Sequence, residues 1–265
     1  ALDEGYEIRL RRAPDLRLAC IEAYGPSEGL TLVSLRELLG LIGAHEWRKK
    51  GIEIPALGGR IHPHYGVFSP TRGEYVGLVA EASLPACTRA FDIGTGTGVL
   101  AAVLARRGIS HIVATDQDPR ALICARENLT RLGFIDRVEV VQADLFPEGR
   151  AQLILCNPPW VPARPSSPIE QAIYDFESRM LRGFLNGLAS HLEPGGEGWL
   201  LLSDLAEHLE LRTRAELLAV FERAGLRVIG KIDARPNHPR VSDQTDPLHA
   251  ARAAEVTSLW RLGVR

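Results

Sequence analysis

Four consecutive residues at 157–160 combine side-chain types that suit one kind of chemistry. Asn157, Pro158, Pro159 and Trp160 follow the apolar run at 153–156. The nitrogen of an amide or of an aromatic amine is a poor nucleophile because its lone pair is delocalised. A carboxamide oxygen and a backbone carbonyl can accept both of its N–H groups and direct the nitrogen at an electrophile. The prolines would hold that carbonyl rigidly and the indole offers a planar surface, so we expect all four residues to be catalytic.

A second motif precedes this one, with an acid and three glycines at alternate positions. Asp92 lies two residues ahead of Gly94, and Gly96 and Gly98 follow at intervals of two. Glycines in such a turn permit positive φ and a close approach of the backbone to a ligand. The dinucleotide fingerprint would need a glycine where this chain has Val99, and a carboxylate there would repel a pyrophosphate. The same carboxylate suits an ammonium group, which favours a nucleoside carrying a cationic amino acid, as S-adenosylmethionine does.

Two further acids occur at comparable points downstream. Asp116 ends the next expected strand, 20 residues after Gly96, where a carboxylate can bind both ribose hydroxyls. Asp144 ends the strand after that and could accept a hydrogen bond from the adenine amino group. Each acid alone could equally be a helix cap or a turn former. Together with the glycine loop, these acids predict a nucleoside site along one edge of a sheet.

The elements that would position these residues alternate regularly from residue 88 onward. Helices are expected at 98–107, 119–132, 169–192 and 205–224. Strands alternating with helices indicate a parallel sheet covered on both faces. The predicted fold class is therefore α/β, a doubly wound and mostly parallel sheet of seven strands. The strands are expected at 89–93, 111–116, 138–144, 153–157, 198–203, 226–232 and 255–262.

The N-terminal part follows a different pattern. Ser34 and Glu37 have the spacing of a capping box at the start of a helix. Gly58 and Gly59 lie between two short apolar runs that predict a hairpin. Residues 1–30 show no clear period, and their role stays open.

Composition limits the class of protein. The chain has 265 residues, 45% of them apolar and 24% charged, with a net charge of −2, which is ordinary for a globular protein. No apolar run approaches the roughly 20 residues of a membrane helix, and no signal peptide is recognisable, so we expect a cytoplasmic protein without membrane contact. The four cysteines are scattered, and His62 and His64 have no third ligand nearby, so we expect no metal site.

The whole pattern resembles the class I S-adenosylmethionine-dependent methyltransferase superfamily over residues 88–262. The resemblance implies residues 1–75 as an N-terminal substrate-recognition region and residues 76–265 as the methyltransferase domain, with a Rossmann-like fold. Gln117 departs from the apolar residue that the superfamily often has at its position. The implied cofactor-binding residues are Asp92, Gly94, Thr95, Gly96 and Gly98 for the methionine part, Asp116 for the ribose, Gln117, Asp144 and Leu145 for the adenine, and Asn157 beside the methyl group.

The residues at 157–160 resemble the Asn-Pro-Pro-aromatic signature of N-methyltransferases that act on glutamine amides or on adenine and cytosine amines. The segment "GVFSPTRGEYVGLV" is similar to the one that precedes the cofactor loop in HemK-like protein-glutamine methyltransferases. By that resemblance Phe68, Pro70 and Glu74 fill comparable positions, and Thr71 and Arg72 contact cofactor or substrate. The chain lacks the Arg-Pro pair usual in the bacterial release-factor enzymes, and it has tryptophan where their motif commonly has tyrosine.

The resemblance leaves the methyl acceptor open. A protein glutamine on a release factor or ribosomal protein is the expected acceptor. The alternatives are adenine N6 of RNA or DNA, then a small molecule, then a non-enzymatic scaffold that only binds the cofactor. We also expect the polar segment at 234–252 to contact substrate. A nucleic-acid substrate would need a basic groove near Trp160, for which the candidates are Arg164, Arg179, Arg182, Arg235, His238 and Arg240.

Overall fold

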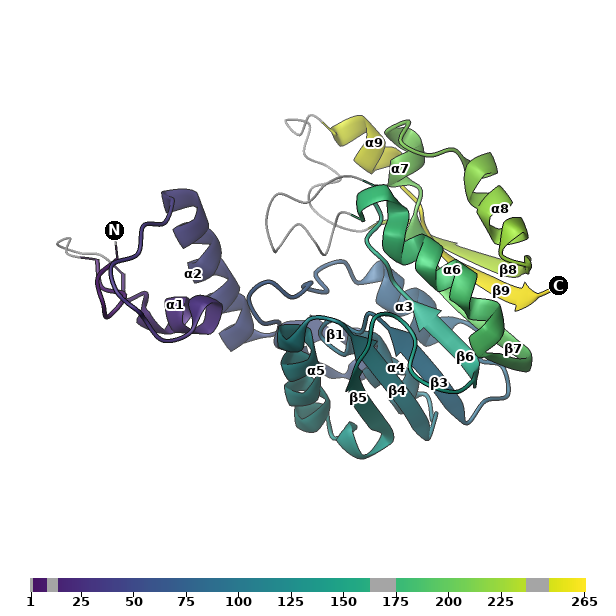
Figure 1. The fold of residues 1–265 in the computed structure, drawn as a ribbon, viewed down its shortest axis with the longest axis horizontal. Coiled ribbons are helices and arrows are strands. Elements are labelled where there is room, and N and C mark those ends of the chain that lie inside the picture. Colours follow the sequence, from purple (N-terminus) through teal and green to yellow (C-terminus); the bar gives the residue numbers. More distant parts are fainter. Residues whose placement is uncertain (1, 9–13, 163–174, 237–247) are drawn as a thin grey trace.

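The computed structural model describes residues 2–8, 14–162, 175–236 and 248–265. Within them, seven strands form one sheet in the order β5-β4-β3-β6-β7-β9-β8 (Figure 1). Neighbours in it are parallel except that β9 runs antiparallel to β7 and β8. The predicted fold class is confirmed. The strands are β3 (Arg89–Ile93), β4 (His111–Asp116), β5 (Val138–Gln142), β6 (Ala151–Cys156), β7 (Leu192–Ser203), β8 (Leu226–Ala234) and β9 (Thr257–Val264).

Alternate strand residues contribute to two cores, one on each face of the sheet. In β6, Leu153 and Leu155 belong to the core that α3, α4 and α5 cover, whereas Ile154 and Cys156 belong to the core under α6 and α8. This period of two is the geometry of a strand buried on both faces. The helices of this part are α3 (Glu74–Glu81), α4 (Val99–Arg106), α5 (Pro119–Leu132), α6 (Arg179–His191), α7 (Leu205–His208), α8 (Arg214–Arg223) and α9 (His249–Ala254).

Local capping signals set several helix ends as predicted. The Asp118 side chain accepts a hydrogen bond from the backbone N–H of Arg120, Pro119 is the first residue of α5, and Gly133 ends it in the left-handed region. Ser34 likewise accepts from the N–H of Glu37.

Two predicted helices differ from the structure. Within the described residues, the helix expected at 169–192 begins at α6, because Glu177 and Ser178 before it have φ of 56° and 53° and belong to the short turn η4 (Phe176–Ser178). The helix expected at 205–224 is broken into α7 and α8. Thr213 accepts from the N–H of Glu216, whose carboxylate accepts from Thr213 in return, so this capping box starts α8 as a new helix.

The segment expected as a polar loop at 234–252 contains α9 at its end, and residues 237–247 of it lie outside the described residues. The first residues of the helix expected at 169–192, up to residue 174, also lie outside them. The hypothesis that this polar segment contacts substrate therefore stays a prediction.

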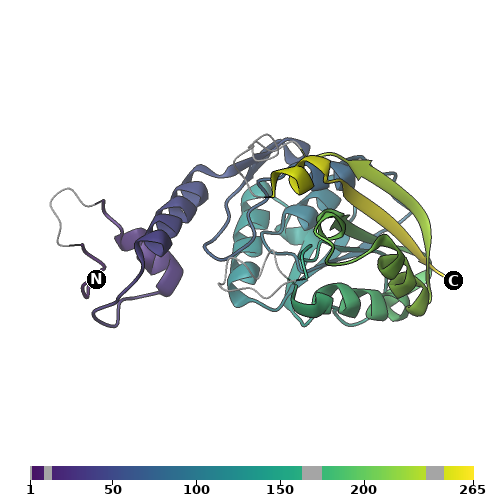
Figure 2. The same cartoon turned by 90° about the horizontal axis from the view of Figure 1, so that it is seen from above.

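The N-terminal helices form a small unit of their own. Figure 1 and Figure 2 both show α1 (Arg17–Tyr24) and α2 (Leu35–Lys50) projecting from the sheet domain. They pack around a separate core that includes Leu16, Cys20 and Leu41. The predicted hairpin is present as β1 (Ile52–Ile54) and β2 (Gly59–Ile61), joined by η1 (Pro55–Leu57), and its apolar side chains belong to the core of the sheet domain. No described helix is long and apolar enough to span a membrane.

Candidate active site

The glycine loop between β3 and α4 has the backbone conformation that its sequence predicts. Gly94, Gly96 and Gly98 have φ of 71°, 54° and 80°, a region that residues with a Cβ rarely adopt. A Cβ on Gly94 would collide with the Met180 side chain, and one on Gly98 would lie 3.2 Å from the Ala125 Cα. The loop is therefore tightly packed against α5 and α6 and ends at the N-terminus of α4.

Asp92 is buried beneath this loop. Its Oδ2 accepts hydrogen bonds from the Thr95 hydroxyl at 2.7 Å and from the Ala101 backbone N–H at 3.1 Å. Burial raises the pKa of the carboxyl group to about 6, although both hydrogen bonds act in the opposite direction. Asp92 thus holds the loop to the first turn of α4, and its predicted contact with an ammonium group stays a prediction.

Asp116 lies beside the loop at the end of β4, as predicted. Its two carboxylate oxygens accept from the backbone N–H groups of Gly96 and Asp118, each at 3.0 Å. Burial raises the pKa of this carboxyl group, and the two backbone hydrogen bonds oppose that rise. Because each carboxylate oxygen has a further lone pair, the side chain can still accept from a pair of hydroxyl groups. The ribose contact itself is a prediction.

The residues predicted to bind adenine are at the same edge but are more exposed. Asp144 pairs with Arg179 at 2.9 Å, and both side chains are largely exposed. Leu145 has φ of 78°, and its carbonyl oxygen accepts from the Thr115 hydroxyl at 2.5 Å. The Gln117 side chain is exposed just beyond β4. The structure therefore brings these residues to the edge of the glycine loop, and their contact with adenine is a prediction.

The residues at 157–160 leave the sheet directly beside the glycine loop. Ile93, the last residue of β3, pairs in register with Cys156, the last residue of β6. The next residues, Gly94 and Asn157, therefore follow adjacent positions at the same edge of the sheet. This register brings together two motifs that lie more than 60 residues apart in the sequence.

Within the motif, the tryptophan and the asparagine bond to each other. The indole N–H of Trp160 donates to Asn157 Oδ1 at 2.9 Å. An indole nitrogen can only donate, so its partner must be the carboxamide oxygen, and this contact fixes which way the carboxamide points. Pro158 is buried, whereas Asn157 and Pro159 are half-buried. The sequence predicts that Asn157 Oδ1 accepts only from the substrate. In the structure Trp160 occupies one lone pair of this oxygen, and the second lone pair can still accept a hydrogen bond.

Arg72 covers one face of the Trp160 ring. Its guanidinium carbon lies 5.0 Å from the ring centroid, and the edge of Tyr75 contacts the ring at a centroid distance of 6.4 Å. Arg72 donates to Glu74 at 2.8 Å and to Glu255 at 3.0 Å. Burial lowers the pKa of Arg72, but the two carboxylates outweigh it and the net pKa is raised. Arg72 therefore lies beside Trp160, and the predicted contacts of Arg72 and Glu74 with cofactor or substrate stay predictions.

Sequence reasoning missed Glu255 and Ser203. The Glu255 side chain is 1% exposed and also accepts from the Ser203 hydroxyl at 2.5 Å. Neither residue belongs to a motif, since they meet only because β7 and β9 are neighbours in the sheet. Of the other residues predicted from the 66–79 segment, Phe68 packs against Tyr75, Pro70 is buried and Thr71 is exposed. We assign Phe68 and Pro70 to packing.

No group of three or more His, Cys, Asp or Glu side chains that could hold a metal ion occurs in the described part of the chain. The Nδ1–H of His62 donates to the Arg48 carbonyl oxygen at 2.6 Å, and His64 pairs with Glu127 at 2.8 Å. These histidines therefore join the hairpin to α2 and α5.

This arrangement fits S-adenosylmethionine. A positive-φ loop allows close approach of the ligand, and the buried Asp92 and half-buried Asp116 beside the loop suit an ammonium group and ribose hydroxyls. When bound, the cofactor supplies a methyl group on a positively charged sulfur. Asn157 follows the adjacent strand end, and its predicted place beside that methyl group stays a prediction.

Comparisons with known proteins agree with this assignment. The profile of the family described as "Methyltransferase small domain" matches residues 58–224. A release factor glutamine methyltransferase of Cereibacter sphaeroides is 35% identical over 47% of this chain and 50% of its own length. A tRNA1(Val) (adenine(37)-N6)-methyltransferase of Bacteroides thetaiotaomicron is 33% identical over 60% of this chain and 70% of its own length. The chain thus spans only half of the first of these relatives.

Solved structures show the same fold. A methyltransferase of Pyrococcus furiosus superposes with a TM-score of 0.53 at 19% identity, covering 86% of this chain and 98% of that one. A ribosomal protein L11 methylase of Lactobacillus delbrueckii superposes with a TM-score of 0.52 at 18% identity, covering 77% and 85%. Since the family profile covers more than half of the chain, the chain belongs to the methyltransferase small domain family.

Proposed function

We propose that this enzyme transfers a methyl group to a planar amide or aromatic amine nitrogen. The observation that carries the proposal is the register of Ile93 with Cys156, which sets Asn157 beside the glycine loop. The Asn157 oxygen has one lone pair left after accepting from Trp160, and that lone pair accepts one substrate N–H. The Pro158 carbonyl accepts the second N–H. Two acceptors fix the plane of the nitrogen and direct it at the methyl group.

The motif needs no strong base for this role. Transfer cancels the positive charge of the sulfonium and leaves it on the methylated nitrogen, which then loses its proton. The contribution of the protein is therefore orientation, and its rigidity comes from Pro158, Pro159 and the bond from Trp160.

Two acceptor classes fit this geometry. A protein glutamine is supported by the release-factor relative, and a ribosomal protein L11 methyltransferase of Pelotomaculum thermopropionicum is 46% identical over 25% of this chain and 22% of its own length. Adenine N6 of RNA is supported by the tRNA methyltransferase, of which this chain covers the larger share. Both acceptors present a planar nitrogen with two N–H groups. The motif alone therefore does not choose between them.

The experiment is methylation of a cell extract with tritiated S-adenosylmethionine. Wild-type enzyme and Asn157→Ala are compared, and each product is divided between ribonuclease and protease treatment. The proposal is supported if the label depends on Asn157 and is recovered on nitrogen, as N6-methyladenine or N5-methylglutamine. Whether ribonuclease removes the label then identifies the acceptor class. Label recovered on oxygen or carbon overturns it.

A further inference from the structure

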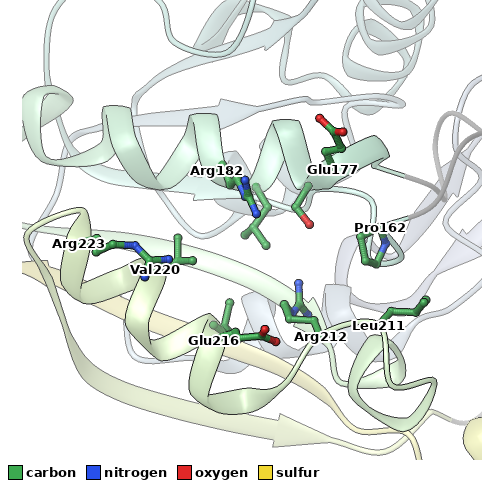
Figure 3. Close-up of a pocket in the computed structure, with 11 residues that line it drawn as sticks. Pro162, Glu177, Arg182, Leu211, Arg212, Glu216, Val220 and Arg223 are labelled. Atoms are coloured by element: carbon green, nitrogen blue, oxygen red, sulfur yellow. The ribbon is translucent and has the colours of Figure 1, made fainter.

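A groove of about 780 Å³ lies between α6 and α8 (Figure 3). Figure 3 shows Arg182 pointing from α6 into the gap, with Arg212 and Arg223 on the side of α8. A second cavity of about 190 Å³ continues it and shares Arg182 and Arg223. Three guanidinium groups, those of Arg182, Arg212 and Arg223, therefore line the larger groove.

Two nitrogen atoms of the Arg212 guanidinium have no hydrogen-bond acceptor in the described part of the chain. Its Nε and Nη2 atoms are buried and have no hydrogen-bond partner among the described residues. Burial lowers the pKa of Arg212, so the folded protein meets a cost for keeping this charge out of water. A guanidinium is satisfied best by a planar or tetrahedral anion that accepts two parallel N–H bonds. The groove therefore contains a donor that suits an anionic ligand.

The acids in the groove do not supply that acceptor. The Glu216 carboxylate already accepts from the backbone N–H and the hydroxyl of Thr213, at 2.7 and 2.9 Å, in the cap of α8. Glu177 is the other acid of the lining. The lining itself has three arginines and two glutamates, and Glu207 and Asp175 also act on Arg212 from outside the lining without a hydrogen bond to its Nε or Nη2.

The position of the groove indicates which anion it takes. Pro162, which lines the groove, is two residues beyond Trp160, so one short segment of chain joins the groove to the motif. A base presented at Asn157 always brings phosphate groups on either side of it. A glutamine side chain is neutral, and its neighbours carry no obligatory charge. The groove is thus explained by a nucleic-acid substrate and not by a glutamine as such.

We propose that the groove between α6 and α8 binds the phosphate backbone of a single-stranded nucleic acid whose target base lies at Asn157. This inference rests on the proposed N-methyl transfer and names its substrate class. Arg182 was among the basic candidates from the sequence, whereas Arg212 and Arg223 were not. Arg179 pairs with Asp144 instead, and Arg235 is exposed outside the lining; Arg164, His238 and Arg240 lie outside the described residues.

The test is fluorescence anisotropy with a labelled 20-nucleotide RNA of mixed sequence, titrated at several salt concentrations. The variants are Arg182→Glu with Arg223→Glu, both exposed positions, and Arg212→Met. The matched control is Arg150→Glu, an exposed arginine just before β6 at the opposite edge of the sheet. We expect the double variant to bind at least about tenfold more weakly and to lower the salt slope by roughly 1.4, since each phosphate contact contributes about 0.7 for single strands. The control should bind as the wild type does.

Equal RNA binding by the double variant and the wild type overturns the inference. So does tighter binding of a labelled poly-glutamate peptide than of RNA, which would make the groove a protein site. The RNA-binding result can be told apart from a failure of the proposed function. If the groove variants bind RNA normally, nitrogen methylation that depends on Asn157 can still be observed. In that case only the groove assignment fails.

Discussion

Replacing Asp92 by asparagine is predicted to stabilise the fold above pH 7 and to weaken cofactor binding. Its carboxyl group is 1% exposed, and burial raises its pKa from 3.8 to about 6. Because the folded pKa is the higher one, the folded state binds more protons than the unfolded state between these values. The stability that this group contributes is therefore present below about pH 4 and is lost as the pH rises through about 6. The gap between 3.8 and about 6 corresponds to about 3 kcal/mol above pH 7.

Asp92→Asn removes the buried charge and keeps the shape. The carboxamide oxygen can still accept from Thr95 and Ala101, but each neutral hydrogen bond is weaker by about 1 kcal/mol. The expected net gain above pH 7 is therefore about 1 kcal/mol, which raises Tm by about 2–4 °C. At pH 4 the wild-type carboxyl is itself protonated, and the gain should disappear. Loss of the ammonium partner should weaken S-adenosylmethionine binding at least about tenfold.

Thermal unfolding at pH 4.5, 6 and 8 measures the first part, and calorimetric titration with S-adenosylmethionine measures the second. Asp136→Asn, an exposed acid in η2 (Ile135–Arg137), is the matched control and should show neither effect. A Tm below that of the wild type at pH 8, or a gain of equal size at pH 4.5, would refute the reasoning about burial. Unchanged cofactor affinity would refute the ammonium contact.

Two further predictions concern the support of the motif. Trp160→Phe keeps an aromatic ring and removes the hydrogen bond to Asn157, which is worth about 1 kcal/mol. We therefore expect kcat to fall about fivefold and the Kd for S-adenosylmethionine to stay unchanged. An unchanged kcat in steady-state assays would show that the indole does not orient the carboxamide. Arg72→Met leaves Glu74 and Glu255 buried without their cation, which should lower the free energy of unfolding by about 3–5 kcal/mol and Tm by about 6–20 °C. Adding Glu255→Gln should restore part of the lost Tm. A fall in Tm of less than about 2 °C, or no recovery in the double variant, contradicts the assigned ion cluster.

Much of the fold follows from local signals in the sequence. Asp118 and Pro119 start α5 and Gly133 ends it, because these residue types satisfy the free backbone groups at helix ends. The same kind of signal at Thr213 and Glu216 was available and was overlooked, which is why one long helix was expected in place of α7 and α8. The left-handed residues Glu177 and Ser178 have no such signature, so the start of α6 was not predictable.

The site was predictable where sequence motifs carry it. The glycine loop has its positive φ angles because only glycine adopts them readily, and spacing alone locates Asp116 beside it. Contacts that depend on tertiary packing were not predictable. Arg72 and Glu255 are far apart in the sequence and meet only through packing. The motif itself does not predict the bond between Trp160 and Asn157, and no pattern predicts that Arg212 lacks acceptors among the described residues.

The central claim is that Asn157 orients the acceptor nitrogen and contributes little to the affinity for the cofactor. The most direct measurement is kcat of Asn157→Ala at saturating S-adenosylmethionine, with the cofactor Kd measured by calorimetry on the same preparation. Loss of a preorganised hydrogen-bonding group at a reacting centre predicts a fall in kcat of at least about a hundredfold. The Kd should remain within about threefold of the wild type, because Asp92, Asp116 and the glycine loop are intact. A near-normal kcat would contradict the account.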